Sequence, residues 1–129
     1  MTKTALVLGI VISLGLSQQG VANAQIQSRE PARLTEYFNR VVDAIYVIEG
    51  GQRAKVAYGI CSVKVSSAVE ARQVCLNTVR NNYRRWKNHK GPQESFRSFL
   101  GKRYCPPQLG GDNRYWLRNL SHYVGEPQD

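Results

Sequence analysis

The chain has 129 residues, 42% of them hydrophobic and 21% charged, a composition typical of one globular domain rather than a disordered or collagen-like chain. Lys and Arg total 18 against 9 Asp and Glu, a formal charge of +9 that favours an anionic partner such as nucleic acid, an acidic membrane surface or an acidic polymer. No apolar run reaches the roughly 18 residues of a spanning helix, which excludes a protein with several membrane spans.

The first 24 residues have the pattern of a signal peptide. Lys3 supplies positive charge, residues 5–16 form a short apolar stretch, and Ala22 and Ala24 fit the small-x-small rule for cleavage. Cleavage near Ala24 would leave residues 25–129 as a single exported domain, periplasmic or secreted. An N-terminal membrane anchor is the alternative, and the shortness of the apolar run disfavours it.

The first predicted helix begins at about Pro31 or Arg33 and ends at Glu49. Apolar residues recur at alternating steps of four and three and form one stripe: Leu34, Phe38, Val41, Ile45 and Ile48. Gly50 and Gly51 end the helix, because glycine adopts the left-handed conformation without steric cost. Glu49 is therefore expected to be the last helical residue, at the edge of the buried stripe.

A β-like insert and a second helix are predicted next. Residues 52–65 are rich in β-branched side chains, which favours short extended pieces and a small hairpin turning at Gly59. Ser67 and Glu70 then form a capping box at the start of a helix that residues 91–92, Gly-Pro, terminate. Its predicted buried positions are Ala68, Ala71, Val74, Cys75, Val79, Asn82, Tyr83 and Trp86.

Two shorter helices complete the prediction. One spans about residues 93–103, and after a loop over residues 105–111 the other begins with Asp112 or Asn113 as its cap. The buried residues expected from these helices are Phe96, Phe99, Leu100, Trp116, Leu117, Leu120, Tyr123 and Val124. The tail, residues 125–129, is expected to fray. The fold class is thus mainly α, with about four helices and one small irregular or β insert.

Three cysteines, Cys61, Cys75 and Cys105, predict one disulfide and one free thiol in an exported protein, in any of three pairings. A structural zinc site or a Cys/His hydrolase is the alternative. The chain has no C-x-x-C motif, and His89 and His122 are its only histidines, so both alternatives are disfavoured. Both histidines are expected at the surface.

Glu49 is the main candidate for catalysis. It is an acidic side chain at a helix C-terminus, where the helix dipole favours a basic one, and such violations of local preference tend to mark functional sites. Partial burial beside an apolar stripe would suit a general acid. Gly50 and Gly51 have no side chains and would let a polymer approach closely. The alternative is an ordinary solvated glutamate.

Two motifs carry a resemblance to a known family. Residues 48–51, Ile-Glu-Gly-Gly, and residues 58–63, Tyr-Gly-Ile-Cys-Ser-Val, resemble the lysozyme superfamily and most closely its small lytic transglycosylases. Residues 99–104 and 113–120 resemble the end of that domain. The resemblance implies an α+β lysozyme-like fold in which Glu49 ends the catalytic helix and acts as general acid and base on the β-1,4 bond between MurNAc and GlcNAc.

The same resemblance implies a substrate-binding set without metal or cofactor: Gly50, Gly51, Tyr58, Gly59, Ile60, Ser62 and Tyr104. Two positions depart from the family pattern, since Ser62 replaces a frequent Gln and Cys105 follows Tyr104 where Asn is usual. Trp86 and Trp116 lie on apolar stripes and are assigned to packing.

By the resemblance, one glutamate suffices for a lytic transglycosylase, whereas most glycosidases use two carboxylates. No acid close behind Glu49 has an obvious role in a cleft, which favours the single-acid scheme, although a second carboxylate brought near by folding stays an alternative. Expected partners are peptidoglycan strands and an envelope-spanning assembly, with a monomeric protein and no nucleic acid. A non-catalytic secreted protein that binds nucleic acid, acidic glycan or envelope lipid is the alternative of another class, and the same fold without catalysis is a third.

Overall fold

The computed structural model describes residues 30–104 and 113–128, and within them the protein is mainly helical. Its elements are α2 (Ala32–Ile48), η1 (Gly51–Arg53), η2 (Ala57–Gly59), α3 (Ala68–Lys87), α4 (Phe96–Tyr104) and α5 (Arg114–Tyr123). The prediction of a mainly α fold with about four helices is confirmed. No helix in this described part is both long and apolar enough to cross a membrane.

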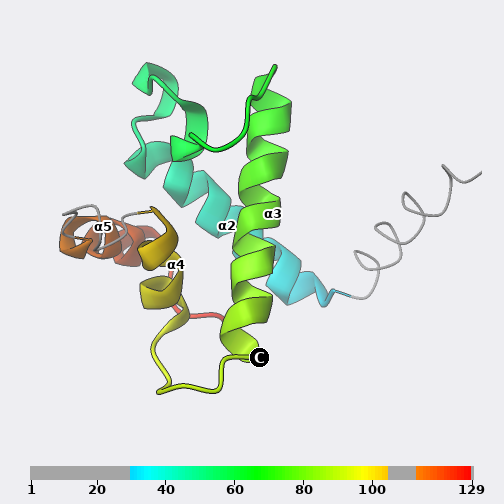
Figure 1. The fold of residues 1–129 in the computed structure, drawn as a ribbon, viewed down its shortest axis with the longest axis vertical. Coiled ribbons are helices and arrows are strands. Elements are labelled where there is room, and N and C mark those ends of the chain that lie inside the picture. Colours follow the sequence, from blue (N-terminus) through cyan, green and yellow to red (C-terminus); the bar gives the residue numbers. More distant parts are fainter. Residues whose placement is uncertain (1–29, 105–112, 129) are drawn as a thin grey trace, which may run out of the picture. The chain divides into compact units, whose positions relative to one another are not determined.

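The four α-helices enclose one hydrophobic core within the compact unit Pro31–Asp129. α2 packs against α3 and α5, and α4 contacts both α3 and α5 (Figure 1). The largest fully buried side chains come from all four helices: Phe38, Val41, Val42, Ile45, Cys75, Val79, Phe96, Leu100 and Leu120. The predicted stripe of α2 is confirmed, with Leu34 and Ile48 partly buried at its ends.

The ends of α2 and α3 follow the sequence closely. Pro31 is the residue before α2, and Glu49 caps its C-terminus, one position beyond the last helical residue. Ser67 Oγ accepts the Glu70 backbone N–H at 3.1 Å, as expected of the cap. The Glu70 carboxylate, however, accepts the backbone N–H and the hydroxyl of Ser66, at 2.7 and 2.6 Å, and these bonds lower the pKa of Glu70.

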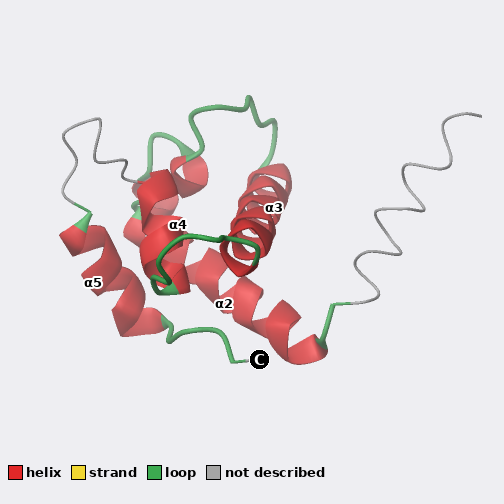
Figure 2. Cartoon of the chain, turned by 60° about the horizontal axis from the view of Figure 1, so that its bottom comes forward, coloured by secondary structure: helices red, strands yellow, loops and turns green. Residues whose placement is uncertain are grey.

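The predicted β insert is wrong in its secondary structure. Between residues 49 and 67 the described chain forms the 3-10 helices η1 and η2 and no strand (Figure 2). The expected turn at Gly59 is present, but Tyr58 and Gly59 both have left-handed φ angles, +57° and +64°. Two such residues in a row interrupt an extended chain, so the β-branched residues around them form no ladder.

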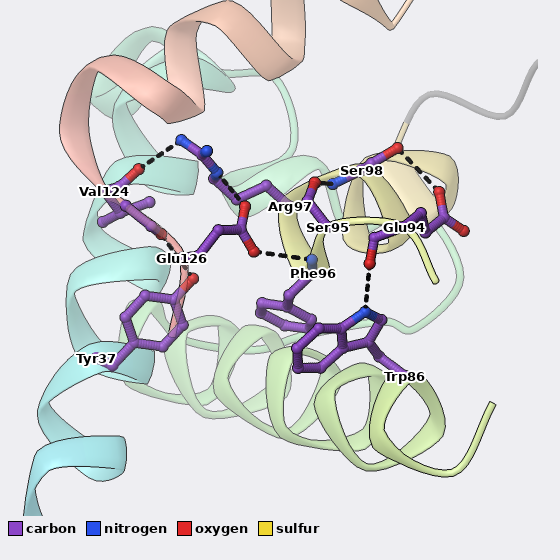
Figure 3. Close-up of polar contacts among 10 residues, drawn as sticks. Tyr37, Trp86, Glu94, Ser95, Phe96, Arg97, Ser98, Val124 and Glu126 are labelled. Atoms are coloured by element: carbon purple, nitrogen blue, oxygen red, sulfur yellow. Dashed lines mark hydrogen bonds and ion pairs between the residues drawn. The ribbon is translucent and has the colours of Figure 1, made fainter. Parts of the chain in front are cut away.

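The C-terminal segment is fixed rather than frayed over the described residues 124–126. Tyr37 Oη donates to the Gly125 carbonyl at 3.0 Å, and Arg97 donates to the Val124 carbonyl at 3.1 Å. Glu126 forms an ion pair with Arg97 and accepts the Phe96 N–H at 2.8 Å (Figure 3). These contacts join the end of the chain to α2 and α4, which the tail's own composition did not indicate.

Candidate active site

The Glu49 side chain is half-buried at the C-terminus of α2. Its backbone N–H continues the helix by donating to the Ile45 carbonyl at 2.9 Å. Gly50 and Gly51 follow with φ angles of +107° and +58°, so the chain leaves the helix immediately after the carboxylate. This turn needs glycine, as the sequence predicted, and it fixes where the Glu49 side chain starts.

A tryptophan holds one oxygen of the Glu49 carboxylate. Trp116 Nε1 donates to Glu49 Oε1 at 2.9 Å, between residues 67 positions apart in the chain. The Trp116 ring is buried and stacks on Tyr104, with ring centroids 5.1 Å apart and an interplanar angle of 13°. The Tyr104 hydroxyl lies 3.4 Å from the Cys75 Sγ. Glu49 is therefore positioned by a chain of contacts from α5, α4 and α3.

The other oxygen of the carboxylate faces Gly59. A Cβ atom placed on Gly59 would lie 2.7 Å from Glu49 Oε2 and 2.8 Å from its Cδ, closer than real Cβ contacts. The left-handed Tyr58 brings this glycine into place, at a backbone cost of about 1–2 kcal/mol for a residue with a side chain. Strained backbone of this kind often lies at functional sites. The two oxygens thus differ, because Oε1 has the Trp116 donor and Oε2 lies against bare backbone.

Gly59 also lines a groove with a volume of about 320 Å³. It is lined by residues 59–63, Val74, Thr78, Arg103 and Tyr104. Besides Gly59, three of the residues predicted to bind substrate line this groove: Ile60, Ser62 and Tyr104. Glu49 itself does not line the groove. Two residues connected to it do: Gly59, which contacts its carboxylate, and Tyr104, which stacks on its donor Trp116.

Tyr58 differs from the expectation. Its side chain is 8% exposed and packs on Tyr46, with ring centroids 5.2 Å apart, so it belongs to the core rather than to the groove. Burial raises the pKa of its hydroxyl. The left-handed backbone of Tyr58 turns its ring inward, and the role of this residue is to shape the turn that carries Gly59.

The cysteines also differ from the expectation. Cys61 is exposed and Cys75 is buried, and both are free thiols, so neither forms the predicted disulfide. Burial raises the pKa of the Cys75 thiol to about 11, despite its contact with Tyr104. Burial, and then the neighbouring Cys75, also raises the pKa of Tyr104. Both groups stay neutral at physiological pH. Cys105 lies outside the described residues.

Most other described carboxylates have partners away from Glu49. Those of Glu36, Asp43, Glu94 and Glu126 pair with Arg40, Arg72, Lys102 and Arg97 respectively, and Glu70 caps α3. In the part of the chain that the structure describes, no group of three or more His, Cys, Asp or Glu side chains could hold a metal ion. Glu49 differs from these acids in that its carboxylate lies against Gly59, a residue of the groove lining.

Trp116 is the site residue that the sequence interpretation missed. It was assigned to packing because it lies on the apolar stripe of α5, and its ring is indeed buried. A buried indole N–H nevertheless needs an acceptor, which is the one signal that favoured a polar role. The other tryptophan, Trp86, satisfies the same need structurally by donating to the Glu94 carbonyl at 2.7 Å.

We predict that Gly59→Ala severely impairs any reaction that uses Glu49. The added methyl group collides with Oε2, and a left-handed φ is strained for alanine, so the carboxylate must move. Gly125→Ala is the matched control, because a Cβ there meets nothing within 4 Å. Rates of wall digestion and thermal melting curves of both variants test this, and unchanged digestion by Gly59→Ala would contradict it.

Trp116→Phe is expected to lower kcat by about tenfold to a hundredfold with little change in KM. Phenylalanine keeps a ring to stack on Tyr104 but removes the N–H, and a hydrogen bond to a charged group contributes about 1.5–3 kcal/mol. A purely structural role would lower the melting temperature without this separation of kcat from KM. Kinetics on soluble glycan strands, alongside thermal melts, distinguish the two.

Compared with protein-family models, with curated proteins and with solved structures, the chain matches none of them.

Proposed function

We propose that the protein is an exported peptidoglycan-cleaving enzyme that cuts the β-1,4 bond between MurNAc and GlcNAc, in the manner of a lytic transglycosylase. The observation that carries the proposal is the setting of Glu49. Its carboxylate is half-buried, accepts the Trp116 N–H at Oε1, and lies with Oε2 against Gly59, which lines a groove.

The division of labour between the two oxygens supports an acid/base role. The indole N–H can only donate a hydrogen bond, and it donates to a lone pair of Oε1. Oε2 is therefore the oxygen that carries and releases the proton in the proposed reaction. A proton donor must reach its acceptor to within about 3 Å in the bound complex. The absence of a side chain at Gly59 lets Oε2 lie directly against the backbone of a residue that lines the groove.

In the proposed reaction, the protonated Glu49 gives its proton to the glycosidic oxygen as the C1–O bond of MurNAc breaks. The resulting carboxylate then takes the proton from the 6-hydroxyl of the same sugar, and O6 bonds to C1. The products are a 1,6-anhydromuramyl end and a free 4-hydroxyl on GlcNAc. No water is consumed, and Glu49 ends in the protonated state in which it began.

The pairing of the other carboxylates supports one acid rather than two. A glycosidase with two carboxylates places them about 5–10 Å apart across the bond that is cut. Four of the other described acids pair with basic side chains and Glu70 caps a helix, whereas the Glu49 carboxylate contacts Gly59 of the groove lining.

Digestion of purified cell-wall sacculi, followed by mass spectrometry of the soluble products, tests the proposal. We expect muropeptides with anhydro ends, which are lighter than hydrolysed ends by one water. Reducing ends would instead show hydrolysis and overturn the transglycosylase mechanism. A protein that releases no muropeptides but binds DNA tightly and loses that binding steeply with salt would be the non-catalytic polyanion-binding protein.

A further inference from the structure

Among the described residues that line the groove beside Glu49, one has a charged side chain, Arg103. It lies in the last turn of α4, is exposed, and belongs to the groove lining. No hydrogen bond or ion pair joins it to another residue in the described ranges, whereas Arg40, Arg72 and Arg97 each pair with a carboxylate. The arginine that faces the groove is thus available to an anionic ligand.

The rest of the lining is suited to a small, partly apolar ligand. Ile60, Val63 and Val74 supply aliphatic surface, and Ser62 and Thr78 supply hydroxyl groups. A nucleic acid would need several cations along a groove, together with exposed aromatic residues on which its bases stack. One guanidinium among aliphatic side chains instead matches a short peptide with methyl side chains and a free carboxylate.

We infer that this groove binds the stem peptide of peptidoglycan, with a stem carboxylate on the Arg103 guanidinium. The inference rests on the proposed function and adds to it the part of the substrate recognised beside the glycan. Charge complementarity is its basis, since stem peptides carry alanine methyl groups and free carboxylates. Arg103 is then a specificity-determining residue that acts on the peptide, while Glu49 acts on the sugar.

Binding by the full chain carrying Glu49→Gln, which leaves the ligand intact, tests this inference by calorimetric titration. The probes are a GlcNAc-MurNAc tetrapeptide and the same compound with its carboxylates converted to amides. We expect amidation to weaken binding about tenfold, because a charge-assisted hydrogen bond contributes about 1.5–3 kcal/mol. With Arg103→Gln added, the two probes should bind equally and weakly.

Arg85→Gln is the matched control, since Arg85 is an exposed arginine in the last turn of α3 and is not part of the groove lining. It should keep the preference for the native probe. Equal binding of the two probes with Arg103 present, or an unchanged preference in Arg103→Gln, would overturn the inference, as would no binding at all. Wall digestion by the chain with Glu49 intact separates the inference about Arg103 from the proposal about Glu49. If this chain cleaves the wall but shows no preference for the probe with free carboxylates, only the role of Arg103 is rejected. If it shows that preference but does not cleave the wall, only the catalytic proposal is rejected.

Discussion

Glu49→Gln is expected to reduce wall cleavage by about a thousandfold or more while leaving the fold intact. An amide oxygen can still accept the Trp116 N–H, so the local contacts of the side chain survive. The amide cannot donate or accept the proton that the reaction moves twice, and general acid–base catalysis alone contributes about 10²–10⁴-fold. Muropeptide release from sacculi measures the loss, and a thermal melt measures the fold.

Two further variants make the result specific. Glu49→Asp retains the acid but shortens the side chain by one methylene, which withdraws it from the Trp116 N–H, so it should also lose most activity. Glu36→Gln changes a glutamate on the same helix whose side chain is 71% exposed, and it should behave as the parent protein. Activity of Glu49→Gln near that of the parent would reject Glu49 as the proton donor.

Phe96→Ala is expected to lower the free energy of unfolding by about 3–5 kcal/mol. Phe96 is fully buried, and its ring lies near those of Tyr37 and Trp86 (Figure 3). It also contacts the ring of Tyr83, and the three centroid distances are 5.4–6.2 Å. Truncation leaves a cavity where α2, α3 and α4 meet. Because a domain of this size has a total stability of about 5–15 kcal/mol, the variant should unfold at much lower urea concentration.

Phe99→Ala on the same helix is the control for this prediction. Phe99 is only partly buried and its ring contacts that of the exposed His89, so its truncation should cost about 1 kcal/mol. Equilibrium urea denaturation of the two variants measures the difference in unfolding free energy. Equal effects would show that Phe96 is not the central side chain of this core.

The helices could be predicted from the sequence because each carries its own signals. The stripe of α2, the Ser67 cap of α3 and the Gly50-Gly51 turn are all local patterns, and local patterns determine where helices begin and end. The same reasoning placed Glu49 at a helix end. Tyr123 was wrongly predicted to be buried, since it is 51% exposed near the end of α5, where the stripe turns away from the core.

What could not be predicted depends on contacts between distant residues. The β-branched residues of the 52–65 segment indicated strands, but a strand needs a partner, and the left-handed Tyr58 and Gly59 lie in the middle of this segment. The donor on Glu49 comes from Trp116, and the tail is fixed by Arg97 and Tyr37. Nothing in a window of neighbouring residues contains such information.

The hydrogen bond between Trp116 of α5 and Glu49 at the end of α2 also determines when, during synthesis, Glu49 acquires its donor. Glu49 is made early, but its indole donor emerges 67 residues later, and the segment that follows α5 contributes Glu126 to the ion pair with Arg97. A nascent or C-terminally truncated chain therefore has the carboxylate without its support. Under the proposed function, such a chain is expected to cleave the wall less efficiently than one that contains α5.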